Sequence, residues 1–304
     1  MSATRSPSQP RLVTTRTELV AALTEHRRAG ERVGFVPTMG ALHDGHASLM
    51  TRARTEVGAG PLVASVFVNP LQFGPDEDLD RYPRTLEADL EVCAAQGVDV
   101  VFAPAVDEVY PGDVARPAVT VDPGPLGDVL DGRSRPGHFA GVLTVVAKLF
   151  GLVQPDVAVF GQKDYQQLVL IQQMAADLCF GVEVVGAETV REPDGLALSS
   201  RNRFLDDEQR LDALALSRTL QAAAASSAYG VQAALDAARA ELRAAPGVDL
   251  DYFEIRLPDL APLPEHPGQG GTEARALIAA RVGTTRLIDN LPLTLATRTL
   301  EESP

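Results

Sequence analysis

The sequence has few cysteines, few aromatic residues and no tryptophan. Its two cysteines, Cys93 and Cys179, stand in apolar helical surroundings and lack the Cys-x-x-Cys spacing of a redox or zinc site. This pattern argues against a disulfide scaffold and against a cysteine-based metal centre. We expect both cysteines to be small core residues in a reducing compartment.

Long hydrophobic runs and a surplus of positive charge are also missing. No segment approaches the roughly 18 uninterrupted apolar residues that a membrane-spanning helix needs, and residues 1–10 have no apolar targeting core. Lys and Arg total 27 against 41 for Asp and Glu, a net charge of −14. A cytoplasmic protein without a membrane or nucleic-acid partner is therefore predicted.

Two nucleotide-binding fingerprints are absent as well. The sequence has neither Gly-x-Gly-x-x-Gly nor Gly-x-x-x-x-Gly-Lys-[Ser/Thr], which argues against a dinucleotide Rossmann enzyme and a P-loop ATPase. No repeat of 20 to 50 residues is visible.

Apolar strands alternate with amphipathic helices through the first two thirds of the 304 residues. Such alternation predicts βαβ units and a parallel sheet flanked by helices. The expected strands are 33–36, 62–68, 98–102, 156–160 and 182–187, and the expected helices are 17–29, 47–57, 85–96, 139–152 and a segment ending at 178. Residues 113–136 are rich in Gly, Pro and Asp, and we expect an extended surface excursion there.

The alternation of strands and helices stops near residues 189–202, and the sequence becomes rich in alanine after them. Two Ala-rich helices, 206–227 and 231–245, precede strand-like segments at 252–257, 276–280 and 285–288. We therefore expect a Rossmann-like domain over residues 1–189 and a smaller α+β domain over residues 190–304.

The stretch from Pro37 to His46 is the most informative part of the chain, because it turns from a buried strand into a helix. Backbone N–H groups at a helix start are unpaired and carry partial positive charge, so they suit phosphate. His43 and His46 stand there in a His-x-Gly-His pattern, and Gly45 lets a ligand approach the backbone closely. The pattern is similar to the signature of the nucleotidyltransferase superfamily.

Polar residues follow other predicted strands too, where ligands of such sheets bind. Gln72 follows the second strand, and Lys163 follows the fourth. Arg133, Arg135 and His138 precede an apolar helix, and the segment 199–201 combines two serines with an arginine, as a phosphate clamp would.

Five motifs in order and spacing resemble the pantothenate synthetase family over residues from about 15 to 290. They are PTMGALHDGH at 37–46, FVNPLQF at 67–73, HFAGV at 138–142, FGQKDYQQ at 160–167 and SSRN at 199–202. The resemblance implies ATP-dependent condensation of pantoate with β-alanine to pantothenate, AMP and diphosphate through a pantoyl adenylate. It also implies a homodimer and ATP accompanied by Mg²⁺, whose protein ligands the sequence does not identify.

The resemblance also assigns roles to residues. His46, as proton donor, and His43, Lys163 and Arg201 would be the catalytic residues. Gln72 would contact both pantoate and β-alanine, Gln167 would hold pantoate, and Arg135 and His138 would stand near the substrate cleft. The ATP site would comprise Met39, Gly40, Ala41, Leu42, His43, Asp44, Gly45, His46, Gly161, Gln162, Lys163, Asp164, Val190, Leu198, Ser199, Ser200 and Arg201.

Two residues depart from the pattern of the family. Gln162 stands where Glu is frequent, which argues against a required carboxylate there, and Leu198 replaces a frequent Met at similar volume. The chemistry needs no protein nucleophile, which agrees with the absence of a Ser/His/Asp or Cys/His arrangement. The second domain, carrying residues 199–201, would act as a lid that shields the adenylate from water.

Three other functions stay open at this point. A different nucleotidyltransferase would keep the nucleotide in its product, whereas the predicted ligase releases AMP. A nucleotide-binding regulator would bind ATP without turnover but leaves Gln72 and Gln167 unexplained. An aminoacyl-tRNA synthetase shares the first motif, but the net charge of −14 and the lack of an RNA-binding domain argue against it.

Overall fold

The computed structural model describes residues 9–74, 79, 82–114, 117–264 and 271–296. Its contacts divide the chain into two compact units. Unit 1 comprises residues up to Gln162 together with Gln166–Thr189, and unit 2 comprises Lys163–Tyr165 together with the residues from Val190 onward. The short segment Lys163–Tyr165 thus belongs to unit 2 although unit 1 precedes and follows it in the sequence.

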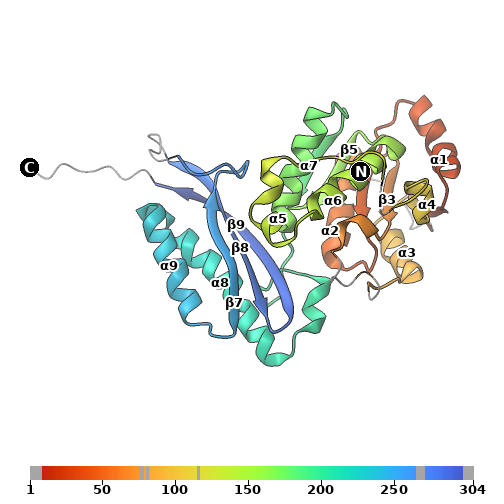
Figure 1. Ribbon diagram of the computed structural model, residues 1–304. Coiled ribbons are helices and arrows are strands. Elements are labelled where there is room, and N and C mark those ends of the chain that lie inside the picture. Colours follow the sequence, from red (N-terminus) through yellow and green to blue (C-terminus); the bar gives the residue numbers. More distant parts are fainter. Residues whose placement is uncertain (1–8, 75–78, 80–81, 115–116, 265–270, 297–304) are drawn as a thin grey trace, which may run out of the picture. The chain divides into compact units, whose positions relative to one another are not determined.

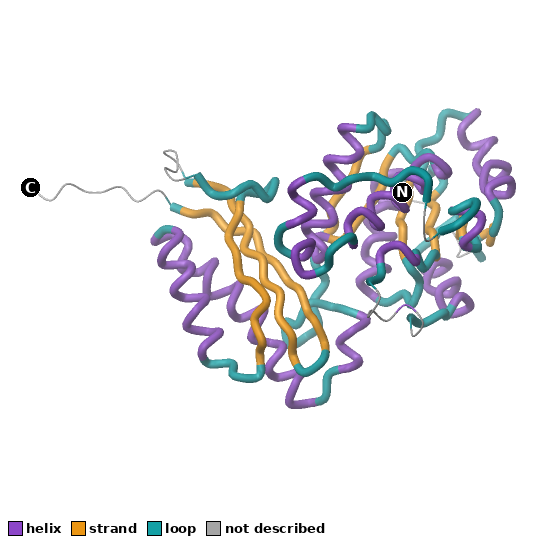
Figure 2. The backbone as a smooth tube through the Cα atoms, viewed as in Figure 1, coloured by secondary structure: helices purple, strands orange, loops and turns teal. Residues whose placement is uncertain are grey.

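Unit 1 contains a six-stranded parallel sheet in the order β1-β4-β3-β2-β5-β6 (Figures 1 and 2). Its strands are β1 (Arg11–Val13), β2 (Gly34–Thr38), β3 (Leu62–Val66), β4 (Val100–Phe102), β5 (Val157–Gly161) and β6 (Glu183–Ala187). Every pairing between these strands is parallel. The predicted Rossmann-like sheet is therefore confirmed, although the three-residue edge strand β1 was too short for its periodicity to be recognised.

Helices cover both faces of this sheet. α2 packs on β2, β3 and β5 and contacts α3, whereas α6 contacts β2 and packs beside α1. The helices of the Rossmann-like region are α1 (Arg16–Arg28), α2 (Asp44–Val57), α3 (Leu86–Ala95), α4 (Val106–Val109), α5 (Asp131–Ser134), α6 (His138–Val153) and α7 (Tyr165–Asp177). The short 3₁₀ turns are η1 (Pro70–Gln72), η3 (Pro125–Asp128) and η4 (Gln162–Asp164).

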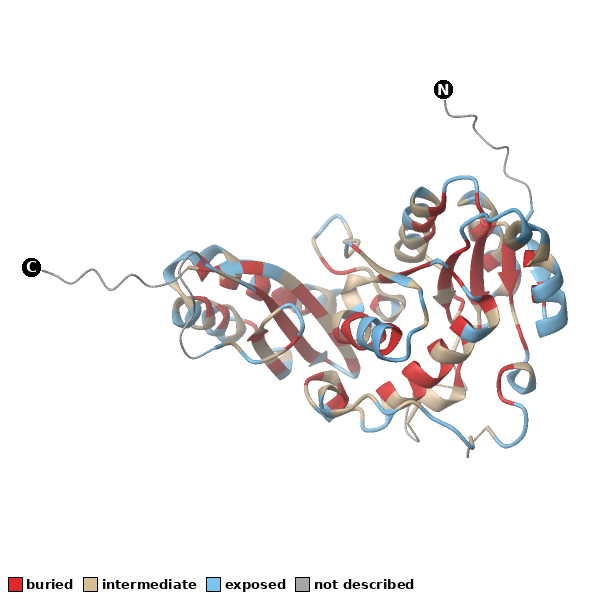
Figure 3. Ribbon diagram, turned by 90° about the horizontal axis from the view of Figure 1, so that it is seen from above, coloured by how far each residue is buried: buried red, intermediate tan, exposed pale blue. Residues whose placement is uncertain are grey.

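The strands of this sheet carry much of the buried apolar surface of unit 1 (Figure 3). Val36, Ala64 and Val159 from neighbouring strands pack with Met50 and Ala53 of α2, and all five side chains have no exposed surface. Strands buried on both faces explain the continuous apolar runs in the sequence.

Unit 2 contains a three-stranded antiparallel sheet with α8 and α9 along it (Figure 2). Its elements are η5 (Ser200–Phe204), α8 (Asp207–Ser226), η6 (Ser227–Tyr229), α9 (Val231–Arg243), β7 (Val248–Arg256), β8 (Thr272–Val282) and β9 (Thr285–Leu295). The order of helices followed by strands is as predicted, but the strands are longer. The small side chains of the Ala-rich helices let α8 and α9 pack closely on the sheet, and Ala213, Ala234 and Ala276 are fully buried.

Two predictions fail in the structure. Residues 113–136 are not an extended excursion throughout, because η3 and α5 lie within them; residues 115–116 are outside the described range.

Cys93 is buried as expected, but Cys179 is exposed. α7 ends at Asp177, and Cys179 takes a left-handed backbone conformation with φ of 55° as the chain turns away from the helix. The helix end was predicted to within one residue, but Cys179 lies past it and so is not part of the buried helix face.

Candidate active site

The two histidines of the His-x-Gly-His turn cap the start of α2. His43 is the N-cap, and its Nδ1 accepts the Gly45 N–H at 3.1 Å. Nδ1 of His46 accepts the His43 N–H at 3.3 Å, and the two ring centroids are 4.2 Å apart. Because Nδ1 of each neutral ring is an acceptor, the ring proton of each lies on Nε2. The sequence motif thus folds into a capping box that fixes both tautomers.

The backbone before these histidines is held by a residue that sequence reasoning missed. Gly40 and Ala41 have positive φ of 82° and 51°. The Asp89 carboxylate of α3 accepts the N–H of Ala41 at 3.2 Å and that of Leu42 at 2.8 Å. A Cβ on Gly40 would lie 2.9 Å from Asp89 Oδ2, so this position requires glycine. Asp89 is only 2% exposed, yet its place inside a helix gave no signal of this role.

The turn stands beside the point where the strand order of the sheet reverses. β2 pairs with β3 on one side and with β5 on the other, and chain connections proceed outward from both. The ladder between β2 and β5 covers only Gly34 and Phe35 with Val157 and Ala158, so their carboxyl-terminal residues do not pair with each other. Ligands of open α/β sheets bind at such a switch point. The segments that follow β2 and β5 include the first and the fourth motif.

Gln72 lies next to the same turn. Its Nε2 donates to Met39 Sδ at 2.9 Å, and its Oε1 accepts from Asn69 Nδ2 at 3.2 Å. Asn69 is buried, and its Oδ1 accepts the Tyr110 hydroxyl at 2.9 Å. Burial also raises the pKa of Tyr110, which keeps that hydroxyl protonated. Asn69 therefore orients η1, and through it Gln72.

Arg135 and His138 converge on the backbone of Gln72. The Arg135 guanidinium lies 2.8 Å from His138 Nε2, and His138 Nδ1 lies 2.8 Å from the Gln72 carbonyl oxygen. Since Arg only donates, His138 accepts at Nε2 and donates from Nδ1. Both residues hold the segment that presents Gln72.

The two glutamines at the start of α7 differ in role. Gln166 is 2% exposed; its Oε1 accepts the Asp131 N–H at 2.9 Å, and its Nε2 donates to two carbonyls of the 126–129 segment. Gln166 is therefore a scaffold residue. Gln167, the expected pantoate contact, is half-buried.

The remaining predicted ATP residues divide between the units. Gly161 and Gln162 belong to unit 1, and Gln162 Nε2 donates to the Gly186 carbonyl at 3.4 Å. Lys163, Asp164, Val190 and residues 198–201 belong to unit 2. There the Ser199 hydroxyl accepts the Arg201 N–H at 3.3 Å and caps η5.

Within the described ranges, no group of three or more His, Cys, Asp or Glu side chains is arranged to hold a metal ion. In the same ranges, no helix has both the length and the apolar character to cross a membrane.

Comparison with known proteins gives one consistent result. The family described as pantoate-beta-alanine ligase matches residues 11–292. The pantothenate synthetase of Nocardioides sp. is 68% identical over 96% of this chain and 87% of its own length. That of Mycolicibacterium smegmatis is 58% identical, covering 90% of this chain and 85% of its own length.

Solved structures agree. The pantothenate synthetase of Thermus thermophilus has a TM-score of 0.84 and 51% identity, over 92% of this chain and 98% of that one. The pantoate-beta-alanine ligase of Francisella tularensis, solved with β,γ-ATP and β-alanine, has a TM-score of 0.73 and 30% identity, over 93% of this chain and 97% of that one. The chain belongs to the pantoate–β-alanine ligase family.

Proposed function

We propose that this chain catalyses the ATP-dependent condensation of (R)-pantoate with β-alanine to pantothenate, AMP and diphosphate, through a pantoyl adenylate. One observation carries the proposal. In a chain of this family, the His-x-Gly-His turn and the Gly161–Gln162 segment lie at the carboxyl ends of β2 and β5, beside the switch point of the sheet. The structure of the Francisella tularensis relative was solved with β,γ-ATP and β-alanine.

For ATP, we propose residues 39–46 and 161–162 of unit 1 together with 163–164, 190 and 198–201 of unit 2. The backbone N–H groups at the start of α2 and the Nε2–H groups of His43 and His46 supply donors for phosphate oxygens. Lys163 and Arg201 supply full positive charges. Mg²⁺ bound to the phosphates of ATP would supply further neutralisation.

The first step joins two anions. A pantoate carboxylate oxygen forms a bond to the α-phosphorus, and the bond between that phosphorus and the bridging oxygen of diphosphate breaks. His46 donates a hydrogen bond to the phosphate from Nε2, where the capping box keeps its proton. Donors held in place before the reaction stabilise the developing charge without reorganisation.

The second step transfers the acyl group. The amine of β-alanine attacks the carbonyl carbon of the adenylate, the amine loses a proton, and AMP leaves with the electron pair of the broken C–O bond. We propose that Gln72 contacts both pantoate and β-alanine and that Gln167 holds pantoate. The side chain of Gln72 is already oriented by Met39 and Asn69. Such orientation of reactants lowers the entropic part of the barrier.

Three further expectations are also proposals. They are a cytoplasmic location, a homodimer, and closure of unit 2 as a lid over the adenylate. Sedimentation velocity tests the dimer: a single species at about twice the 32.3 kDa mass of the chain is expected, and a monomer would contradict it.

The reaction is tested by exchange of labelled diphosphate into ATP, with Mg²⁺ and pantoate present and β-alanine absent. Exchange that requires pantoate is expected, and addition of β-alanine should yield pantothenate with stoichiometric AMP. Exchange without pantoate, or a product that retains the nucleotide, would point to a different nucleotidyltransferase. ATP binding without exchange or product would point to a regulator.

The assignment of site residues is tested separately. His46→Ala should lower exchange roughly 10²- to 10³-fold, because a phosphate donor is lost; wild-type turnover would refute its role.

Lys163 and Lys148 are the two lysines of the chain, and Lys148 lies over the Tyr110 ring at 5.0 Å. ATP should protect Lys163, and not Lys148, from an amine-acetylating reagent followed by mass spectrometry.

A further inference from the structure

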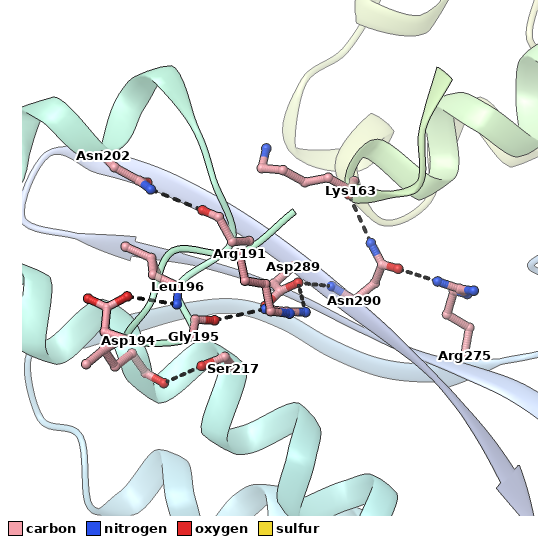
Figure 4. Close-up of polar contacts among 12 residues, drawn as sticks. Lys163, Arg191, Asp194, Gly195, Leu196, Asn202, Ser217, Arg275, Asp289 and Asn290 are labelled. Atoms are coloured by element: carbon pink, nitrogen blue, oxygen red, sulfur yellow. Dashed lines mark hydrogen bonds and ion pairs between the residues drawn. The ribbon is translucent and has the colours of Figure 1, made fainter. Parts of the chain in front are cut away.

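Two adjacent residues of β9, Asp289 and Asn290, are polar yet only 4% and 3% exposed. Successive side chains of a strand point to opposite faces, so the pair can reach two different segments at once. Figure 4 shows these contacts: the Asp289 side chain meets Arg191, and the Asn290 side chain meets the backbone of Lys163. Neither residue belongs to the proposed reaction machinery.

Asp289 holds the base of a small hairpin that leads to the Ser199–Arg201 segment. Its two carboxylate oxygens accept both terminal nitrogens of Arg191, at 2.7 and 2.9 Å. Arg191 is bridged to Ala197 in antiparallel fashion, and the Leu198 N–H donates to the Val190 carbonyl at 2.9 Å. The second arm of this hairpin continues directly into residues 199–201.

A second set of contacts fixes the same hairpin from the side of α8. Glu192 accepts Asn202 Nδ2 and Arg210 Nη2, each at 2.6 Å. Arg210 also donates to the Asp194 carboxylate near the tip of the hairpin. The hairpin that leads into residues 199–201 is therefore anchored to β9 through Arg191 and to α8 through Glu192 and Asp194, and Asn202 ties the chain just after these residues back to Glu192.

Asn290 holds the Lys163–Tyr165 segment. Its Nδ2 donates to the Lys163 carbonyl oxygen at 2.9 Å, and its Oδ1 accepts from Arg275 of β8. The Arg275 guanidinium stacks on the Tyr165 ring, 3.8 Å from the centroid, and the Tyr165 hydroxyl donates to the Pro258 carbonyl at 2.9 Å. Asn290 acts on the Lys163 backbone, while the Lys163 side chain points away from it (Figure 4).

We propose that Asp289 and Asn290, which are adjacent on β9, are positioning residues. Together they fix the spacing between Lys163 and the Ser199–Arg201 segment. The inference rests on the proposed function, in which both segments contact ATP. Two cations can meet the oxygens of one polyphosphate only at a fixed spacing, and a misplacement of about 1 Å can cost about 10²-fold in rate. The Asp289 carboxylate also accepts the Asn290 N–H at 2.7 Å, which joins the two anchors.

The first variant is Asn290→Asp. It keeps the size of the side chain and an acceptor for Arg275, but it loses the N–H that donates to the Lys163 carbonyl. We expect the kcat/KM for ATP in pantoate-dependent exchange to fall roughly 10- to 100-fold, with the KM for pantoate unchanged and the thermal midpoint lowered, because the Lys163 carbonyl loses its donor. Asn290→Ala removes the same donor without an added charge, but it also removes the acceptor for Arg275.

Asp251→Asn is the matched control. Asp251 of β7 pairs with Arg286 of β9 at 2.8 Å, so this variant breaks an ion pair of the same sheet that touches neither ATP segment. Its exchange kinetics should equal those of the wild type.

Double-mutant cycles separate positioning from a general structural effect. In a Lys163→Ala background, Asn290→Asp should cause no further loss; in an Arg201→Ala background, its loss should persist. Asp289→Asn should behave in the opposite way. Equal losses in all backgrounds, or wild-type kinetics of Asn290→Asp, would overturn the inference. Wild-type exchange by Lys163→Ala would instead refute the proposed ATP site.

Discussion

At the residue scale, the two cysteines have opposite environments. Cys93 is buried, and burial together with the nearby Asp89 carboxylate raises the pKa of its thiol to about 12. Cys179 is exposed after the end of α7. The thiolate is the reactive form, so Cys93 should be inert in the folded protein.

Alkylation near neutral pH tests this contrast. A maleimide should place a single label on the native chain, at Cys179, and a second label at Cys93 only after unfolding. Cys179→Ser should abolish native labelling. Rapid labelling of Cys93 in the folded Cys179→Ser variant would contradict its burial.

The raised pKa of Cys93 also has a consequence for stability. Between about pH 9 and about pH 12 the unfolded chain loses the thiol proton while the folded chain keeps it, so the contribution of Cys93 to stability falls as pH rises. In denaturant titrations across the accessible part of this range, Cys93→Ala should show a shallower loss of stability than the wild type. Parallel pH dependences would contradict the shift.

At the scale of elements, the contact of α6 with η1 decides where Gln72 lies. Gly141 of α6 faces η1 so closely that a Cβ there would overlap the Leu71 carbonyl and lie 2.8 Å from the Gln72 nitrogen. Asn69 Nδ2 donates to the Gly141 carbonyl at 3.1 Å, which secures the same contact. The absence of a side chain at Gly141 therefore lets α6 approach η1 closely enough to place Gln72, the proposed substrate contact.

Gly141→Ala should displace η1. We expect a loss of about 1–3 kcal/mol in the free energy of unfolding from overpacking, together with a raised KM for pantoate in the exchange assay. Gly151→Ala in the same helix is the control, because nothing lies within 4 Å of its Cβ position. That change should stabilise the chain by about 0.4–1 kcal/mol and leave the KM unchanged. An unchanged KM in Gly141→Ala would show that η1 does not control pantoate binding.

At the scale of the whole molecule, the net charge of −14 disfavours binding to negatively charged macromolecules such as nucleic acids. Binding to a nucleic-acid backbone depends on neutralising phosphates with cations, and a chain with 41 acidic and 27 basic residues repels polyanions. ATP is still bound in the proposed function, because a few local cations act at short range.

Fluorescence anisotropy with labelled tRNA tests this expectation. No binding should be detected at physiological salt, in contrast to an aminoacyl-tRNA synthetase. Binding that weakens steeply with salt would reveal a basic face that the net charge conceals.

The sequence by itself determined the alternation of strands and helices, the two-part organisation it suggests, and the motifs that carry the family. These signals are local: periodicity reports burial of one face, and motif residues follow one another in the chain. For the same reason local pattern was silent about β1, where three residues give no period, and misleading about Cys179, whose apolar neighbours suggested burial although it lies past the helix end.

Only the tertiary structure decided which distant residues hold the motif residues in place. Asp89 supports the turn before His43 from another helix, and Asp289 and Asn290 anchor segments about 90 to 130 residues earlier in the chain. A buried polar side chain needs a partner, but the sequence does not say which one, since the partner is chosen by the fold. The cations and histidines of the motifs could therefore be identified from the sequence, whereas the residues that position them could not.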